Sequence, residues 1–115
     1  MHWVITQDLS FTEGHRSRVG YGYLPFGNQG PGRDLGHREQ MGWVKEYMGT
    51  HQAMFPFHFR LKDDDGNVDF VGECGDLDQA DADQAFAPLD WAMSDTGSTT
   101  MEYRKKGTNE PWKVL

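Results

Sequence analysis

Cysteine, aliphatic side chains and long apolar stretches are all scarce in this chain of 115 residues. The single cysteine, Cys74, can neither close an intramolecular disulfide nor complete a cysteine-rich zinc site. No stretch approaches the roughly 18 apolar residues that a membrane-spanning helix needs, and the first residues lack the basic-then-apolar order of a secretory signal. We therefore expect a soluble, cytoplasmic protein whose core needs no covalent or metal cross-link.

Aromatic residues compensate for the shortage of aliphatic ones. Leu, Ile, Val and Phe together make up only 21 residues, and such a share beside a net charge of −7 ordinarily indicates disorder. Seven Phe, four Tyr and four Trp can each bury roughly 150–250 Å², however, and six Met can fill the gaps between them. We predict one folded domain over residues 1–115, because two cores could not be filled at this length.

Charge is distributed unevenly along the chain. Residues 1–60 carry a net charge of +1, whereas Asp63 to Asp95 contains eleven carboxylates and no Lys or Arg. A segment so rich in one sign repels nucleic acid and attracts basic surfaces. The sequence therefore predicts a basic protein surface as partner and no direct binding to nucleic acid.

The first half of the chain predicts a strand, a long loop and a helix. Residues 2–6 are aromatic and β-branched, which favours a strand. Residues 8–36 hold seven Gly and two Pro, which favours a long glycine-rich loop with at most a short strand over 19–23. Apolar residues at helical spacing predict an amphipathic helix over 37–48 that ends at Gly49. Its expected buried face consists of Met41, Val44, Tyr47 and Met48.

The second half predicts two hairpins. Phenylalanines alternate with polar residues from Phe55 onward, and Asp65-Gly66 is a common hairpin turn, so we predict a β-hairpin over 57–74. A second hairpin is expected to join 99–104 to 112–115, and Pro88 suits the start of a short helix over 86–93. Residues 75–84 are acidic and lack large apolar groups, which indicates a mobile surface loop.

These elements indicate an α+β fold. We expect a small antiparallel sheet of about five strands, with two hairpins and one or two short helices that cover one face. Alternation along the strand 57–62 turns His58 to the outer face, where it is solvated.

No catalytic or metal-binding motif is recognisable. The turn that starts at Asp63 fails as an EF-hand loop because Leu61 and Gly72 occupy positions that need oxygen ligands. Acidic neighbours would raise the pKa of Cys74, which favours an inert thiol. G-x-S-x-G and the Gly-Lys-Ser/Thr of a phosphate-binding loop are absent. We predict a protein that is not an enzyme and has no cofactor, although Asp78, Asp81 and Asp83 could gather around a divalent cation.

The acidic segment allows two interpretations. It could be a solvated face that keeps an aromatic-rich protein soluble, or it could dock on Lys and Arg side chains that otherwise bind phosphates. Alternate residues of a strand lie about 6.6 Å apart, near the phosphate spacing of a nucleic-acid strand, so Asp69, Val71 and Glu73 could present a phosphate-like row. The candidate partner-binding residues are Asp63, Asp64, Asp65, Asp69, Glu73, Asp76, Asp78, Asp81 and Asp83.

Several stretches resemble one group of known proteins. They are WVITQD at 3–8, FRLKDDDG at 59–66, FAPLD at 86–90, TGST at 96–99 and WKVL at 112–115. In these stretches the chain resembles small acidic proteins of unassigned function from bacteria and their phages and plasmids, although Ser98 stands where a cysteine is expected. The resemblance implies a context, because small acidic proteins of mobile elements often bind host enzymes, including nucleases of defence systems.

Two hypotheses for function follow. The first is a non-enzymatic, acidic interaction protein of a mobile element that binds a basic, nucleic-acid-handling host protein, for example as an anti-CRISPR or other anti-defence inhibitor. The second is a small-molecule-binding or catalytic domain whose glycine-rich loop, with Tyr21, Tyr23 and Phe26, covers an aromatic pocket.

Overall fold

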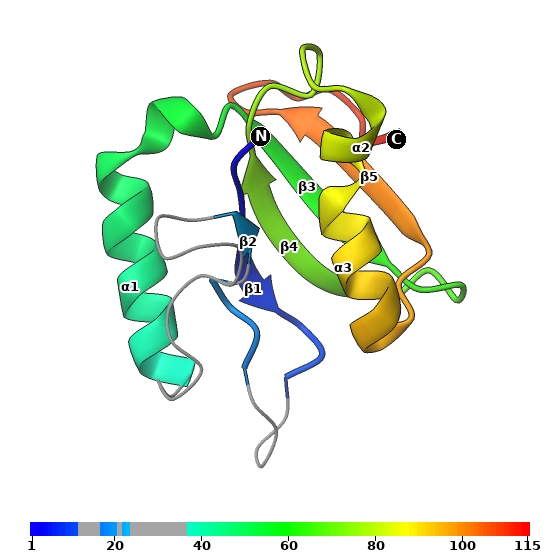
Figure 1. The fold of residues 1–115 in the computed structure, drawn as a ribbon, viewed down its shortest axis with the longest axis horizontal. Helices are drawn as coiled ribbons and strands as arrows, with labels where there is room; N and C mark the ends of the chain where they lie inside the picture. Colours follow the sequence, from blue (N-terminus) through cyan, green and yellow to red (C-terminus); the bar gives the residue numbers. More distant parts are fainter. Residues whose placement is uncertain (12–16, 21, 24–36) are drawn as a thin grey trace.

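The computed structural model describes residues 1–11, 17–20, 22–23 and 37–115, and it confirms the predicted α+β fold (Figure 1). Six strands form one antiparallel sheet in the order β2-β1-β4-β3-β5-β6. The strands are β1 (Trp3–Asp8), β2 (Gly22–Tyr23), β3 (Phe57–Lys62), β4 (Val68–Cys74), β5 (Thr100–Lys105) and β6 (Lys113–Val114). The helices are α1 (His37–Thr50), the 3-10 turn η1 (Gln52–Met54), α2 (Ala82–Ala85) and α3 (Ala87–Thr96).

Both predicted hairpins are present. In the first, β3 pairs with β4 so that Leu61 lies opposite Phe70, and Gly66 closes the turn with a φ of 84° that favours glycine. Pro56 lies just before β3, because a residue without a backbone N–H cannot donate a hydrogen bond to a neighbouring strand. The second hairpin joins β5 to the short β6.

The N-terminal strand lies inside the sheet, between β2 and β4. Gly72 of β4 lies opposite both Ile5 and Phe59. A Cβ atom at Gly72 would overlap the carbonyl oxygen of Val4 and the ring of Phe59. This position therefore tolerates no side chain, and its glycine allows the strands and the core to approach closely.

The main core lies between the sheet and α3. Trp3, Ile5, Phe59 and Phe70 point to this face and pack with Leu89 and other buried residues of α2 and α3. Pro88 lies in the first turn of α3, and Gly97 ends the helix with a φ of 75°. The helix predicted over 86–93 is thus confirmed, and it extends to Thr96.

The opposite face of the sheet is partly covered, which corrects the expectation that helices cover one face only. Helix α1 packs there on a second core that contains Val4, Val19 and Phe55, beside the β1 end of the sheet. Its buried residues are Gln40, Val44 and Met48, at intervals of four, whereas Met41 is 39% exposed. The predicted burial of Met41 was wrong, and the helix continues through Gly49 to Thr50.

Residues 75–84 are more regular than the predicted mobile loop. Backbone N–H groups of Gln79 and Ala80 donate to the carbonyl of Asp76, which closes a turn, and α2 follows. Leu77 is only 8% exposed and joins the main core. One buried leucine and a helix cap anchor a segment whose composition alone indicated a mobile surface loop.

Most of the predicted glycine-rich loop lies outside the described residues, and so do Tyr21 and Phe26 and the side chain of Tyr23. Of the short strand expected over 19–23, β2 is present and pairs with β1. Among the described residues, no helix is both long enough and apolar enough to cross a membrane.

Candidate functional site

The structure divides the nine predicted partner-binding residues into two groups and one separate residue. The tip group lies at or beside the β3–β4 turn, and the loop group follows β4 at its other end (Figure 1). Seven residues of β4 at about 3.3 Å each place the groups roughly 20 Å apart. The tip group is Asp63, Asp64, Asp65 and Asp69, the loop group is Asp76, Asp78, Asp81 and Asp83, and the separate residue is Glu73.

Hydrogen bonds hold the tip group in place. One carboxylate oxygen of Asp63 accepts from the backbone N–H groups of Asp65 and Asn67, at 3.0 and 2.9 Å. The bond from Asn67 is the main reason that the pKa of Asp63 lies below its ordinary value. The carboxylate of Asp64 accepts a hydrogen bond from the hydroxyl of Thr99, and that of Asp69 accepts one from the hydroxyl of Ser98, each at 2.8 Å. The residues that follow α3 therefore hold the β3–β4 turn in place.

The loop group is ordered by the same kind of bond. Asp76 accepts from the N–H of Asp78 at 2.9 Å, and Asp81 caps α2 by accepting from Gln84 at 2.8 Å. Asp78 and Asp83 are exposed, and their carboxylates make no described hydrogen bond. The group therefore presents its charges from a defined backbone.

Within the described part of the chain, no Lys or Arg lies within 4.0 Å of a carboxylate of the tip group or the loop group. Carboxylates elsewhere do have such partners: Asp8 pairs with Arg18, and Glu102 with Arg60. The negative charge of the two groups is thus not neutralised by the basic residues described in the first half.

Helix α3 runs between the two groups. Its first residues follow the loop group, and the residues after its C-terminus contact the tip group through the Ser98–Asp69 hydrogen bond. Asp90 is exposed on this helix, and Met93, one turn further, is 53% exposed. An apolar side chain therefore lies on the helix that connects the two acidic groups.

Glu73 takes no part in this acidic surface. It forms an ion pair with Lys106, whereas Asp69 bonds to Ser98 beside the end of α3. The register of β4 also shifts near Asp69, because Leu61 pairs with Phe70 while Lys62 pairs with Val68. The predicted phosphate-like row of Asp69, Val71 and Glu73 is not formed.

A basic cluster lies on the sheet face that α3 does not cover. Guanidinium carbons of Arg60 and Arg104 lie 4.4 and 4.5 Å from the centre of the Trp112 ring. Glu102 accepts a 2.7 Å bond from Arg60. Burial raises the pKa of Glu102, but bonds from Arg60 and Lys62 outweigh it and lower the pKa. The sequence carries no local signal of this cluster, because its members come from separate strands.

His58 lies in this cluster rather than in open solvent. It is only partly exposed, and Glu73 and Arg104 lie opposite it on the two neighbouring strands. Burial lowers the pKa of His58, and the charges of Lys106 and Arg104 lower it further. Burial and these two cations therefore disfavour the protonated form of His58.

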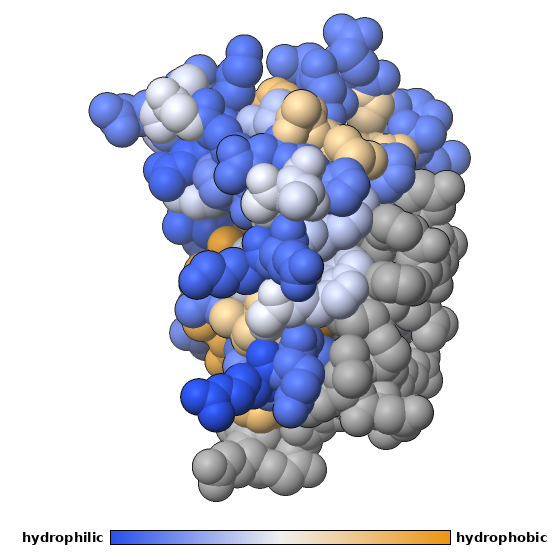
Figure 2. Space-filling model, turned by 90° about the vertical axis from the view of Figure 1, so that its left-hand side faces the viewer, coloured by the Kyte–Doolittle hydropathy of each residue, from blue (hydrophilic) through white to orange (hydrophobic). Residues whose placement is uncertain are grey.

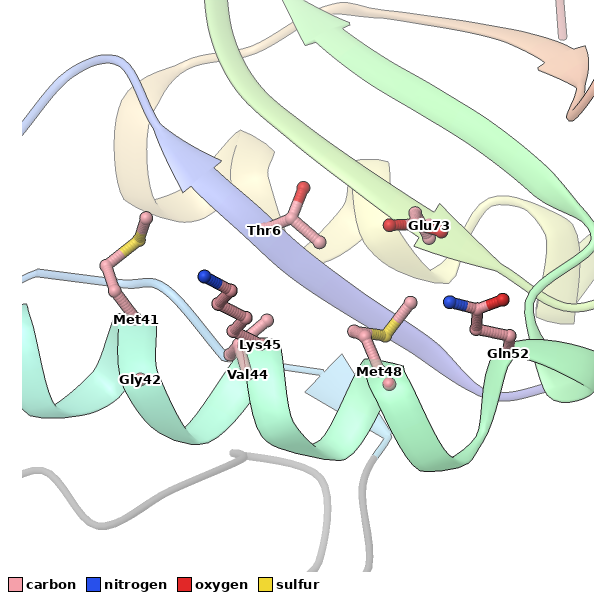
Figure 3. Close-up of a pocket in the computed structure, with 9 residues that line it drawn as sticks. Thr6, Met41, Gly42, Val44, Lys45, Met48, Gln52 and Glu73 are labelled. Carbon is pink, nitrogen blue, oxygen red and sulfur yellow. The ribbon is translucent and has the colours of Figure 1, made fainter.

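A groove of about 600 Å³ separates α1 from β1 and β4 (Figure 3). Among its lining residues, Met41, Val44 and Met48 come from α1, and Thr6 and Glu73 come from the sheet. Figure 2 views the side of the molecule on which α1 lies, where hydrophilic residues dominate and hydrophobic ones form small areas. This groove lies between α1 and the sheet, and its described lining differs from the aromatic pocket predicted under the glycine-rich loop.

Groups that could carry chemistry are few in the described ranges. Burial raises the pKa of Cys74 to about 12, which disfavours the reactive thiolate; the cause of this rise is desolvation and not the acidic neighbours that the sequence suggested. Asp78, Asp81 and Asp83 do not gather into a set that could hold a cation, and no other such set of His, Cys, Asp and Glu exists in these ranges. No pattern in the sequence indicates that the hydroxyl of Ser17 and the ring of His37 lie 2.6 Å apart. Ser17 is buried, so this pair of side chains does not present a nucleophile to a substrate.

Comparison of the chain with protein-family models, with curated proteins and with solved structures gave no match. The case for function therefore depends on the geometry and charge described above.

Proposed function

We propose that this protein is a non-enzymatic interaction protein that docks on a basic surface of a nucleic-acid-handling protein. The proposal depends on one observation: eight aspartates lie in two ordered groups, one near each end of α3, and no described Lys or Arg forms an ion pair with them. Uncompensated charges raise the free energy of the folded state, and a basic partner would remove that cost.

The partner's chemistry follows from the sign and the spacing of the charges. A protein that binds nucleic acid carries Lys and Arg side chains that contact phosphates, and carboxylates can occupy the same sites as those phosphates. The roughly 20 Å between the two groups fits within a protein–protein interface of standard size, about 800 Å² on each partner.

Met93 gives this surface an apolar centre. Interfaces commonly surround a buried methionine or aromatic side chain with a charged rim, and Met93 lies on the helix between the two acidic groups. We assign the rim to the two groups of aspartates and the central contact to Met93.

In its more specific form, the proposal is an inhibitor of a bacterial defence nuclease, such as an anti-CRISPR protein. Support for this form comes from the acidic charge and from the resemblance to proteins of mobile elements. Occupation of a nuclease's phosphate-binding residues would block access of nucleic acid without any catalysis by this chain.

The test is capture of partners from a bacterial lysate at low and high salt, with charge-reversed variants. Asp78→Lys with Asp83→Lys reverses two carboxylates that make no described hydrogen bond, so the fold should survive. Glu39→Lys with Glu46→Lys is the matched control, because it makes the same change in net charge on α1. Reversal of Asp63 is unsuitable, since it would also break the turn.

We expect a nucleic-acid-binding protein to be captured at low salt and lost at high salt. The variant of the loop group should bind it at least about tenfold more weakly, a loss of about 1.4 kcal/mol, while the control binds as the native chain does. Equal binding by both variants would show that the acidic surface is only solubilising.

A further inference from the structure

The groove beside α1 has the dimensions of a small-molecule site. Its volume of about 600 Å³ falls within the roughly 300–1,000 Å³ typical of ligand pockets. Met41 and Met48 of α1 are among the residues that line it, and such side chains adapt to the shape of an apolar ligand (Figure 3).

Two glycines of α1 border the groove. Gly42 and Gly49 lie seven residues apart in α1, so they share one side of the helix, and both line the groove. Each glycine destabilises a helix interior by roughly 1 kcal/mol relative to alanine. A Cβ atom at either position would meet nothing within 4 Å, so close packing is not the reason for the glycines. Larger side chains here would project into free space at the groove.

The polar groups of the groove favour a ligand with one negative charge. Lys45 extends from α1 toward β1 in Figure 3, and no described carboxylate forms an ion pair with it. Glu73, on the opposite wall, is already neutralised by Lys106. The hydroxyl of Thr6 already donates to the carbonyl of Val71. Among the described lining residues, Lys45 is the one that carries a positive charge.

We infer that the groove binds a monocarboxylate with a linear apolar tail, such as a medium-chain fatty acid. The carboxylate pairs with the ammonium of Lys45, and the tail lies along Met41 and Met48. One cation matches one negative charge, and an open groove with thioether walls suits an unbranched chain better than a rigid ring. The inference is independent of the acidic surface around α3.

The test uses decanoate, decanol and decyltrimethylammonium below their micellar concentrations, with the full chain and calorimetry as readout. Decanoate should bind saturably at one site, raise the melting temperature and shift the NMR signals of the Met41 and Met48 methyl groups. Decanol should bind about tenfold more weakly and the cationic amphiphile more weakly still. Equal affinity for all three, or no saturable binding of decanoate, would overturn the inference.

Variants locate the site. Lys45→Met should reduce the affinity for decanoate about tenfold, to that for decanol, and leave decanol binding unchanged. Gly42→Phe should fill the groove and abolish binding of both, whereas Glu46→Phe, a matched change at an exposed residue of α1 that does not line the groove, should retain both. Gly42→Phe should leave the helix at least as stable, because it removes a glycine from the helix interior, and melting curves will show this. Native affinity for decanoate in either Lys45→Met or Gly42→Phe would exclude this groove as the site.

Discussion

The hydroxyl of Ser98 donates a 2.8 Å hydrogen bond to the carboxylate of Asp69, 29 residues earlier in the chain. Ser98 is buried, and Asp69 belongs to β4, so the bond ties the end of α3 to the sheet. A predicted partner-binding carboxylate therefore also has a structural role. The same bond helps to position the tip group.

Ser98→Ala should destabilise the fold by about 1–3 kcal/mol, because it leaves a partly buried carboxylate without its donor. Urea denaturation measures the loss. Ser94→Ala is the control, since Ser94 is exposed and bonds only to the carbonyl of Trp91, and it should change the free energy of unfolding by less than about 0.5 kcal/mol. Equal stability of the two variants would show that the Ser98–Asp69 bond contributes little.

Gly72→Ala should destabilise the protein by about 3 kcal/mol or more, because the new methyl group overlaps the backbone of Val4 and the ring of Phe59. Gly49→Ala, in α1, should instead stabilise it by about 0.5–1 kcal/mol, since nothing lies near its Cβ. Thermal unfolding of both variants tests the packing of the central strands. A harmless Gly72→Ala would contradict the register of β1 on β4.

Cys74 should not react with thiol reagents while the protein is folded. Burial raises its pKa to about 12, so near pH 8 its thiolate is at least about a thousandfold scarcer than that of an exposed cysteine. Labelling with a disulfide reagent, with and without denaturant, measures the difference in rate. Rapid labelling of the native protein would show that the core opens around β4.

His58 should make the fold less stable in mild acid. Its folded-state pKa lies below 6.5, so the unfolded chain binds the proton more tightly, and the free energy of unfolding falls as the pH drops below 6.5. His58→Gln should remove this slope. Glu102 and Asp63, whose folded-state pKa values are also lowered, contribute only at lower pH, below about 4.5 and 3.8.

An NMR titration of the His58 ring gives its pKa directly. Arg104→Gln should raise that pKa, since the charge of Arg104 is one of its causes, after burial and Lys106. A native midpoint at 6.5 or above would contradict the placement of His58 among these cations.

Local patterns were sufficient to predict several elements. Alternating phenylalanines around Asp65-Gly66 predict the β3–β4 hairpin, because side chains of a strand alternate and the turn residues are adjacent. Pro88 likewise marks the first turn of α3. The order of residues 75–84 was missed because one buried leucine and a capping aspartate, rather than composition, hold that segment.

By itself, the sequence determined the α+β class, the first hairpin and the negative charge of residues 63–95, since each depends on neighbours in the chain. Tertiary structure alone decided that the aspartates form two groups, that Glu73 pairs with Lys106 and that a groove opens beside α1. The reason is that β1 pairs with β4, some 65 residues away, and α1 packs on the face opposite α3. Such pairings follow from the burial of the whole core and leave no local pattern.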